Sequence, residues 1–333
     1  MARSPRSAGV LILLLALPLA GCQADAASPQ PQATALVPPE PAPAYDGSAE
    51  PAEAVLSLVP QSADMVTVTD WDQVRVQLGQ PDLTSEDLMT DRRAFWERAG
   101  TEVALLTDGL LVEDGSTYEL GYGFTQDDVD WEAHWTGEDG PGFVLGLRPD
   151  LDLAGVRRAI DDGVGPLKGA ELRAKDDLVV LGVSDVDVWG NEESWQPLVD
   201  EPATATYLHR GCVPLNEALG PDAGAEDQDA LLAEHSVAWL DDLPGFAVAY
   251  GDHQATVWVA PGRRDLFERM RIGEDWPADG FAAAYANGAA DPSTGRLGYA
   301  LPDPPTAAGL ALLGELPFGI CAEVVPFEEP TGW

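Results

Sequence analysis

The sequence lacks an apolar run long enough to form a transmembrane helix. Residues 10–19 are apolar, but a helix needs about 20 such residues to cross a hydrocarbon core of about 30 Å. Arg3 and Arg6 precede this short run. A basic start followed by a short apolar segment is typical of an export signal. We therefore predict a signal peptide over residues 1–21.

Basic residues are also scarce. The chain of 333 residues has 18 lysines and arginines against 57 aspartates and glutamates, and its formal net charge is −39. Such a field repels phosphate backbones and anionic lipid headgroups. Nucleic acid is therefore excluded as a partner, and most of the carboxylates are expected on a solvated surface.

Motifs for nucleophilic catalysis are missing. There is no Gly-x-Ser-x-Gly sequence, and the chain has four histidines. Ser236 lies beside His235, with Asp241 and Asp242 nearby, but neighbouring residues of a helix point apart and do not form a triad. No catalytic residue and no cofactor is predicted, and a non-enzymatic role is favoured.

Metal-binding motifs are missing as well. Asp185 and Asp187 begin like a calcium-binding loop, but Trp189 and Gln196 stand at the fifth and twelfth positions, where that loop has oxygen ligands. No metal site is predicted.

Three cysteines are present, and the first lies in a motif. The residues Leu19-Ala20-Gly21-Cys22 resemble the lipobox of bacterial lipoproteins. In that family the cysteine thiol is joined to diacylglycerol, and the preceding peptide is then removed. The resemblance implies that Cys22 is lipidated and that the chain is anchored on the outer side of a cell membrane, since two or more acyl chains hold firmly.

The other two cysteines, Cys212 and Cys321, form an even pair in a compartment that favours oxidation. We predict a disulfide bond between them.

Residues 22–53 are rich in proline and alanine and contain no basic residue. Such a segment buries too little apolar surface to offset its chain entropy. It is predicted to be a disordered tether. Beyond it, the length suggests two domains, over residues 54–200 and 201–333.

The rest of the chain predicts an α+β fold with largely antiparallel sheets. Two blocks share an order of elements, and the pairs Leu78-Gly79 and Leu219-Gly220 occupy corresponding places in them. This order suggests two related halves, although similar orders also recur by chance. Strands are expected over residues 65–69, 102–106, 117–124, 143–147, 178–183, 204–209, 246–250, 255–260, 296–301 and 319–324. Helices are expected after Thr84, after Asp152, over 226–242 and over 306–313.

Four of the ten tryptophans lie in polar, acidic segments: Trp131, Trp135, Trp189 and Trp195. Aromatic rings beside carboxylates can stack on sugars, so these residues are candidate ligand-binding residues. Trp131 and Trp135 also fit simple packing along a helix face.

Three functions follow from these patterns. The first is a membrane-anchored binding or scaffolding protein of the cell envelope, with an envelope protein or glycan as partner. The second is a solute- or glycan-binding lipoprotein that uses a cleft between the halves. The least favoured is a glycan hydrolase with paired carboxylates such as Asp127 and Glu132, which would have to lie about 5–10 Å apart. In composition, the body resembles uncharacterised lipoproteins of GC-rich Gram-positive bacteria.

Overall fold

The computed structural model describes residues 38–199, 201–277 and 279–327. The chain divides into two units, Met1–Pro38 and Pro39–Trp333. The predicted signal peptide, Cys22 and residues 23–37 of the predicted tether lie outside the described residues, so their predictions stay predictions.

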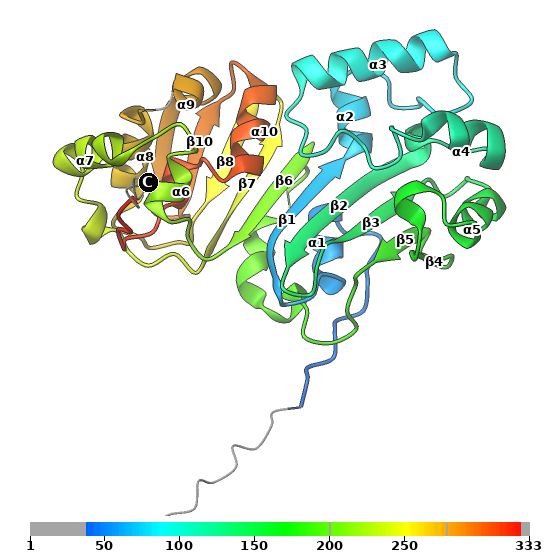
Figure 1. The fold of residues 1–333 in the computed structure, drawn as a ribbon, viewed down its shortest axis with the longest axis horizontal. Helices are drawn as coiled ribbons and strands as arrows, with labels where there is room; N and C mark the ends of the chain where they lie inside the picture. Colours follow the sequence, from blue (N-terminus) through cyan, green and yellow to red (C-terminus); the bar gives the residue numbers. More distant parts are fainter. Residues whose placement is uncertain (1–37, 200, 278, 328–333) are drawn as a thin grey trace, which may run out of the picture. The chain divides into compact units, whose positions relative to one another are not determined.

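The described part of the second unit is built on one antiparallel sheet (Figure 1). Its ten strands lie in the order β4-β5-β3-β2-β1-β6-β7-β8-β10-β9. From the centre outward, the strands of the first half follow in the order β1-β2-β3-β5-β4. Those of the second half follow in the corresponding order, β6-β7-β8-β10-β9. The strands are β1 Ala63–Asp70, β2 Val129–Gly137, β3 Gly142–Leu147, β4 Glu171–Arg173, β5 Leu178–Leu181, β6 Ala205–Arg210, β7 Gly245–Gly251, β8 Gln254–Trp258, β9 Ala286–Asp291 and β10 Arg296–Ala300.

The helices fall into two groups along the sheet (Figure 1). Beside β1–β5 lie α2 Trp71–Gln77, α3 Met89–Glu102, α4 Gly115–Tyr122 and α5 Leu153–Asp161. Beside β6–β10 lie α6 Leu215–Ala218, α7 Ala225–Glu234, α8 Leu266–Glu274, α9 Asp279–Ala284 and α10 Pro304–Leu313. Short 3₁₀ turns complete the fold: η1 Val55–Ser57, η2 Gln126–Asp128, η3 Gly165–Leu167, η4 Trp189–Asn191, η5 Glu193–Leu198, η6 Val237–Trp239 and η7 Pro317–Gly319.

Both groups of helices cover the same face of the sheet. Alternate strand residues point to opposite faces. Leu145 and Leu147 pack with α2–α5, and Val248 and Val257 pack with α6–α10. The opposite face carries a third core, in which Val66 and neighbouring strand residues pack against α1 (Pro51–Ala54), η1 and the segment after β5.

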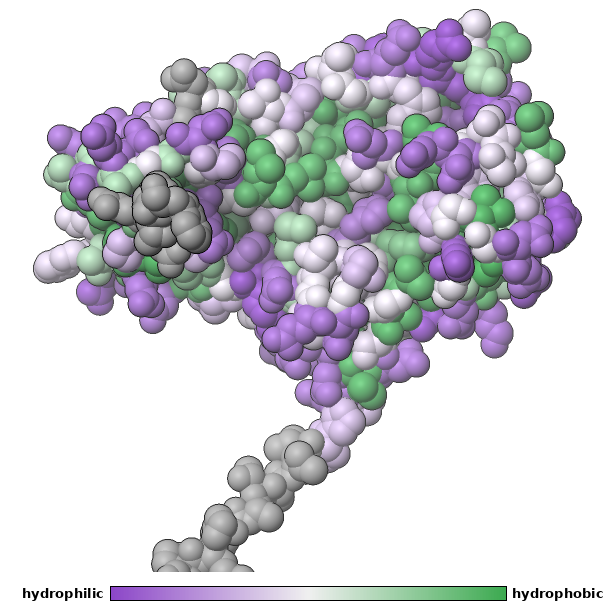
Figure 2. Space-filling view, viewed as in Figure 1, coloured by the Kyte–Doolittle hydropathy of each residue, from purple (hydrophilic) through white to green (hydrophobic). Residues whose placement is uncertain are grey.

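Figure 2 shows a mostly hydrophilic surface, with hydrophobic residues gathered near α10.

The folded part begins earlier than the predicted tether allows. Residues 39–53 belong to the compact second unit, and α1 lies inside the segment that was expected to be disordered. The backbone amide of Asp187 donates to Glu40 O at 2.7 Å, and that of Ala42 donates to Asp185 O at 2.9 Å. These bonds and the burial of Ala52 (6 % exposed) offset the entropy of ordering a proline-rich segment.

The division at residue 200 does not separate two compact units either. β1 and β6 pair antiparallel at the centre of one sheet, with Thr67 opposite Tyr207. Residues 54–200 and 201–333 therefore share a continuous ladder of hydrogen bonds. The fold class is α+β, as predicted.

The predicted disulfide is confirmed. Cys212 and Cys321 are bonded, with their Cα atoms 4.9 Å apart. The bond joins the chain after β6 to the segment after η7, close to the bridge between Val213 and Ile320.

Several predicted elements are wrong. Residues 117–124 lie mostly in helix α4. Glu102 ends helix α3, and residues 103–106 follow it as a loop. The helix expected over 226–242 ends at Glu234. Of residues 319–324, Gly319 ends η7 and Ile320 forms an isolated bridge, so no strand is present there.

Within the described residues, no helix combines the length and the apolar character needed to cross a bilayer.

Candidate functional site

Trp131 and Trp135 lie in strand β2 and point to the same face of the sheet. Their rings lie over Gly146 and Gly142 of β3, their direct partners across the strand pair. Trp131 is 9 % exposed and Trp135 is 2 % exposed. Both rings therefore contribute to the core, although through a strand and not through the helix face that their spacing suggested.

Trp189 and Trp195 lie in the same core. Their rings stack with centroids 4.4 Å apart, and the guanidinium of Arg210 lies 4.7 Å from the centre of the Trp189 ring. Both rings are buried. The structure thus brings all four predicted tryptophans together beneath the sheet, packed against protein, and their ligand-binding role stays a prediction.

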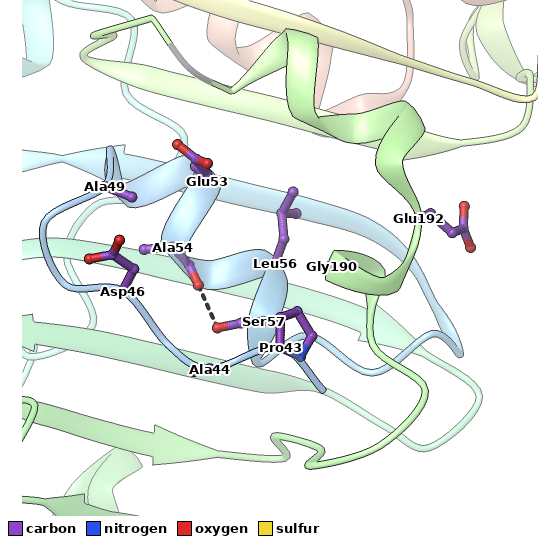
Figure 3. Close-up of a pocket in the computed structure, with 10 residues that line it drawn as sticks. All are labelled: Pro43, Ala44, Asp46, Ala49, Glu53, Ala54, Leu56, Ser57, Gly190 and Glu192. Carbon is purple, nitrogen blue, oxygen red and sulfur yellow. Dashed lines mark hydrogen bonds between the residues drawn. The ribbon is translucent and has the colours of Figure 1, made fainter. Parts of the chain in front are cut away.

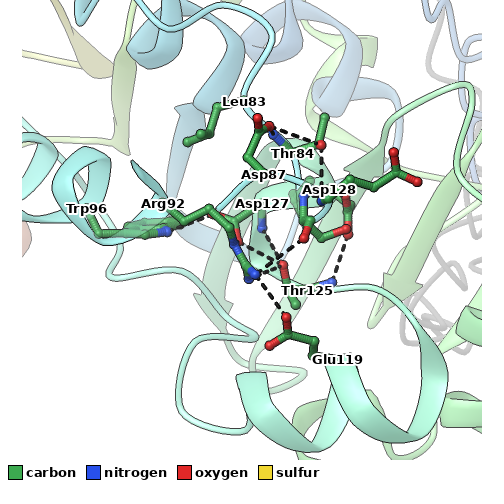
Figure 4. A network of polar contacts seen from close by, with 12 residues as sticks. Leu83, Thr84, Asp87, Arg92, Trp96, Glu119, Thr125, Asp127 and Asp128 are labelled. Carbon is green, nitrogen blue, oxygen red and sulfur yellow. Dashed lines mark hydrogen bonds and ion pairs between the residues drawn. The ribbon is translucent and has the colours of Figure 1, made fainter. Parts of the chain in front are cut away.

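Asp127 lies in a buried polar network beside α3 (Figure 4). Its carboxylate accepts hydrogen bonds from Arg92 Nε at 2.6 Å, Trp96 Nε1 at 2.8 Å and the Thr125 hydroxyl at 2.9 Å. Arg92 also pairs with Glu119 at 3.0 Å. Donors from the protein occupy this carboxylate and fix α3 to the segment before β2, while Arg92 also links α3 to α4 through Glu119.

Glu132 is fully buried and equally engaged. It accepts from Gln126 Nε2 at 2.8 Å and from the backbone amide of Leu110 at 3.2 Å, and it lies 3.3 Å from His134 Nε2. Burial alone would raise the pKa of Glu132, but the hydrogen bond and electrostatic attraction of His134, with further hydrogen bonds from Thr107 and the Leu110 amide, hold this pKa below its usual value. Both carboxylates proposed for a glycan hydrolase thus serve as acceptors inside the fold.

The residues considered for a triad do not converge on a nucleophile. His235 Nδ1 lies 3.2 Å from Glu268, and its Nε2 lies 3.2 Å from Asp275. Asp241 instead accepts from the backbone amide of Arg264 at 3.3 Å. Over the ranges that the structure describes, no group of three or more histidines, cysteines or carboxylates could hold a metal ion.

Asp70 is a buried carboxylate at the start of α2. It accepts a hydrogen bond from the backbone amide of Gln73 at 3.0 Å and is 6 % exposed. Burial, with smaller contributions from Asp72 and Glu50, raises the pKa of Asp70 to about 7. This carboxyl therefore changes charge near neutral pH.

A pocket of about 160 Å³ lies between the segment before β1 and η4 (Figure 3). Asp46 and Glu53 line one side of it. The carboxylate of Glu192 points away from them (Figure 3) and binds Arg210 at 2.8 Å. The pocket has no aromatic or basic lining residue, so it offers little to hold an organic ligand.

A larger groove lies on the second half of the chain, between η6 and α8. It has a volume of about 730 Å³, within the range of about 300–1,000 Å³ that is usual for small-molecule sites. We call it the Trp239 groove. It is lined by Ser236, Trp239, Leu240, Asp241, Arg264, Asp265, Phe267, Glu268 and Arg271.

The two aromatic rings of this groove are open to solvent. Trp239 is 87 % exposed and Phe267 is 47 % exposed. In contrast, Val237 and Leu240 on either side of Trp239 are buried. The backbone of η6 is therefore packed into the body while the indole projects outward.

A buried arginine network supports the groove from below. Arg263 donates to the carbonyl of Asp242 at 2.8 Å, and Arg269 donates to that of Asp241 at 3.0 Å. Asp265 binds both guanidinium groups, at 2.8 and 2.7 Å. Arg269 also donates to the carbonyls of Phe318 and Ile320, each at 2.9 Å. The chain that carries Trp239 is thus fixed to α8 and to the segment that holds Cys321.

Sequence reasoning missed this site because it placed Trp239 inside the helix expected over residues 226–242. The helix ends at Glu234, and η6 turns the indole outward. A signal was available in the sequence: four of the chain's few basic residues fall at positions 263, 264, 269 and 271.

Comparison of the chain with protein-family models, with curated proteins and with solved structures finds no match.

Proposed function

We propose that this protein is a lipid-anchored binding protein of the cell envelope, without catalytic activity of its own, and that it captures its partner in the Trp239 groove. The observation that carries the proposal is the exposed Trp239 ring (87 %) on a backbone that buried arginines hold in place. A large aromatic ring on a fixed backbone is favoured where a protein contacts a partner, because its side chain has few rotatable bonds and loses little entropy on binding.

Two features support a location outside the cytoplasm. The lipobox residues end at Cys22, and the disulfide between Cys212 and Cys321 is typical of proteins in oxidising compartments. Anchoring through a diacylglyceryl thioether on Cys22 would place the folded body at the outer surface of the membrane.

Anchoring and binding are tested separately. The mass of the intact native protein is expected to equal that of the chain from Cys22 plus its lipid, and Cys22→Ala is expected to release the protein from the membrane fraction. An unmodified sulfur with the leader attached would refute the anchor.

For binding, purified insoluble cell wall from the producing cells is the probe. It is expected to retain the wild-type protein, whereas Trp239→Ala should remain in the supernatant. Leu120→Ala serves as a control, because Leu120 is equally exposed (89 %) but does not line the groove. Equal retention of all three proteins, or of none, would refute the groove as the binding surface.

We also propose that the two halves arose by duplication. The mirrored strand order supports this. So do Gly79 and Gly220, which follow α2 and α6 with positive φ angles of 72° and 83°, each after a buried leucine. Superposition of β1–β5 on β6–β10 is expected to align all five strands in order and direction, and a mismatch in either would refute the proposal.

A further inference from the structure

The Trp239 groove presents two aromatic rings in succession. Trp239 projects from η6 and Phe267 from the first turn of α8. Arg271 follows Phe267 by four residues and therefore lies on the same side of the helix. A ligand along the groove would meet apolar ring faces with charged groups beside them.

The groove also offers free hydrogen-bonding groups. Within the part of the chain that the structure describes, neither the guanidinium of Arg264 nor the hydroxyl of Ser236 has a hydrogen-bond partner, and Arg264 bonds to Asp241 through its backbone amide. Arg271 is 59 % exposed along its side chain and binds Glu268 at 3.3 Å. Donors and acceptors both line the site, so a ligand with many hydroxyl groups could bind to each of them.

The charges of the groove are balanced. Arg264 and Arg271 stand against Asp241 and Glu268, while Asp265 is neutralised by the arginines behind it. The whole chain carries a net charge of −39. A polyanion would be repelled, and an entirely apolar ligand would leave the lining polar groups without partners.

We infer that the Trp239 groove binds a neutral glycan, with a pyranose ring stacked on Trp239 and its hydroxyls bonded to Arg264 and the neighbouring polar groups. Sugar rings combine an apolar C–H face with peripheral hydroxyls, and they match this alternation of rings and polar groups. The inference rests on the proposed binding function and specifies its ligand class.

The test is calorimetric titration of the full folded chain with neutral tetrasaccharides of β-1,4-linked N-acetylglucosamine, β-1,4-linked glucose and α-1,4-linked glucose. At least one is expected to bind, and trigalacturonate is expected to bind at least about tenfold more weakly. Loss of a stacked ring corresponds to about a tenfold change in Kd, so Trp239→Ala is expected to weaken binding by about that factor or more.

Matched variants separate the groove from general effects. Arg264→Ala should weaken binding, whereas Arg93→Ala, at an exposed arginine outside the groove, should not. Because the Trp239 side chain is exposed, Trp239→Ala should melt at the wild-type temperature. Trp239→Phe should keep most of the affinity and lose the sugar-induced change in tryptophan emission.

Two outcomes would overturn the inference, and they differ from failure of the binding function. If cell wall retains the protein in a Trp239-dependent manner but no neutral saccharide binds, then the groove binds another wall component, such as peptide, and the glycan assignment is wrong. If a saccharide binds equally well to Trp239→Ala, then the groove is not its site.

Discussion

The indole of Trp135 lies over Gly142, its partner across the β2–β3 pair, so closely that a Cβ atom on residue 142 would overlap the ring. Trp131 lies over Gly146 in the same way. The two glycines leave the space in which large rings of the neighbouring strand pack flat on the sheet. The core beneath the first half therefore depends on residues without side chains.

Gly142→Ala is expected to destabilise the protein by about 1–3 kcal/mol, because the added methyl group forces the buried Trp135 out of its position. Gly298→Ala in β10 is the matched control, since a Cβ there meets no atom within 4 Å. Urea denaturation compares the two variants. Equal stability would contradict the packing described for Trp135.

Removal of the disulfide by Cys212→Ser with Cys321→Ser is expected to lower the free energy of unfolding by about 4–5 kcal/mol. The bond links residues 109 positions apart, and a long loop that is free in the unfolded chain carries a large entropy. Thermal denaturation with and without a thiol reductant measures the loss. Cys22→Ser should melt at the same temperature as the wild type, both with and without the reductant.

Arg269→Met is expected to cost about 3–5 kcal/mol, because it leaves the buried Asp265 with one guanidinium partner and removes the donors to Phe318 and Ile320. Chemical denaturation followed by circular dichroism checks this. Arg93→Met, at an exposed arginine, is the control and should remain within about 0.5 kcal/mol of wild type.

The raised pKa of Asp70 predicts that the free energy of unfolding falls as the pH rises. Its pKa is raised from 3.8 to about 7 in the folded protein, so between these values the folded state holds a proton that the unfolded chain has released. The free energy of unfolding should therefore fall across this window, by up to about 4 kcal/mol. Burial also raises the pKa of Asp130 to about 7, which adds a change of the same sign.

Asp70→Asn should remove its part of this dependence and should be more stable than wild type at pH 8, but not at pH 4. Melting temperatures measured across the range test the sign. Asp150→Asn, at a carboxylate that is 82 % exposed, should follow the wild-type curve. A parallel curve for Asp70→Asn would show that Asp70 is charged throughout.

The sequence predicts those elements whose pattern is local. Asp152 begins α5 by accepting from the backbone amide of Ala154, and the buried strands β1, β3, β6 and β7 follow apolar or alternating runs. Where predictions failed, two periods competed. Tyr118 and Tyr122 are four apart and belong to α4, but the alternation of residues around them also fits a strand.

The opposite error concerned β2. The spacing of Trp131 and Trp135 fits a helix face, although with Ala133 they also alternate as one face of a strand. The position of each tryptophan depended on contacts between distant segments. Residues 39–60 pack beneath the sheet beside Trp189 and Trp195, and neither their proline content nor their charge indicates this. Likewise, the exposure of Trp239 follows from where α7 ends and from the arginines of a later helix.

The hydrogen bonds of Glu40 and Ala42 to residues 185–187 have a mechanical consequence. A pulling force applied to residue 39 would first load these few bonds, before any tension reached β1. Because residues 185–187 lead directly to Trp189, the load would pass into the stacked tryptophans that support the middle of the sheet. The hydrogen bonds of residues 40 and 42 would thus break first under tension, and the hydrogen bonds between the ten strands would remain intact.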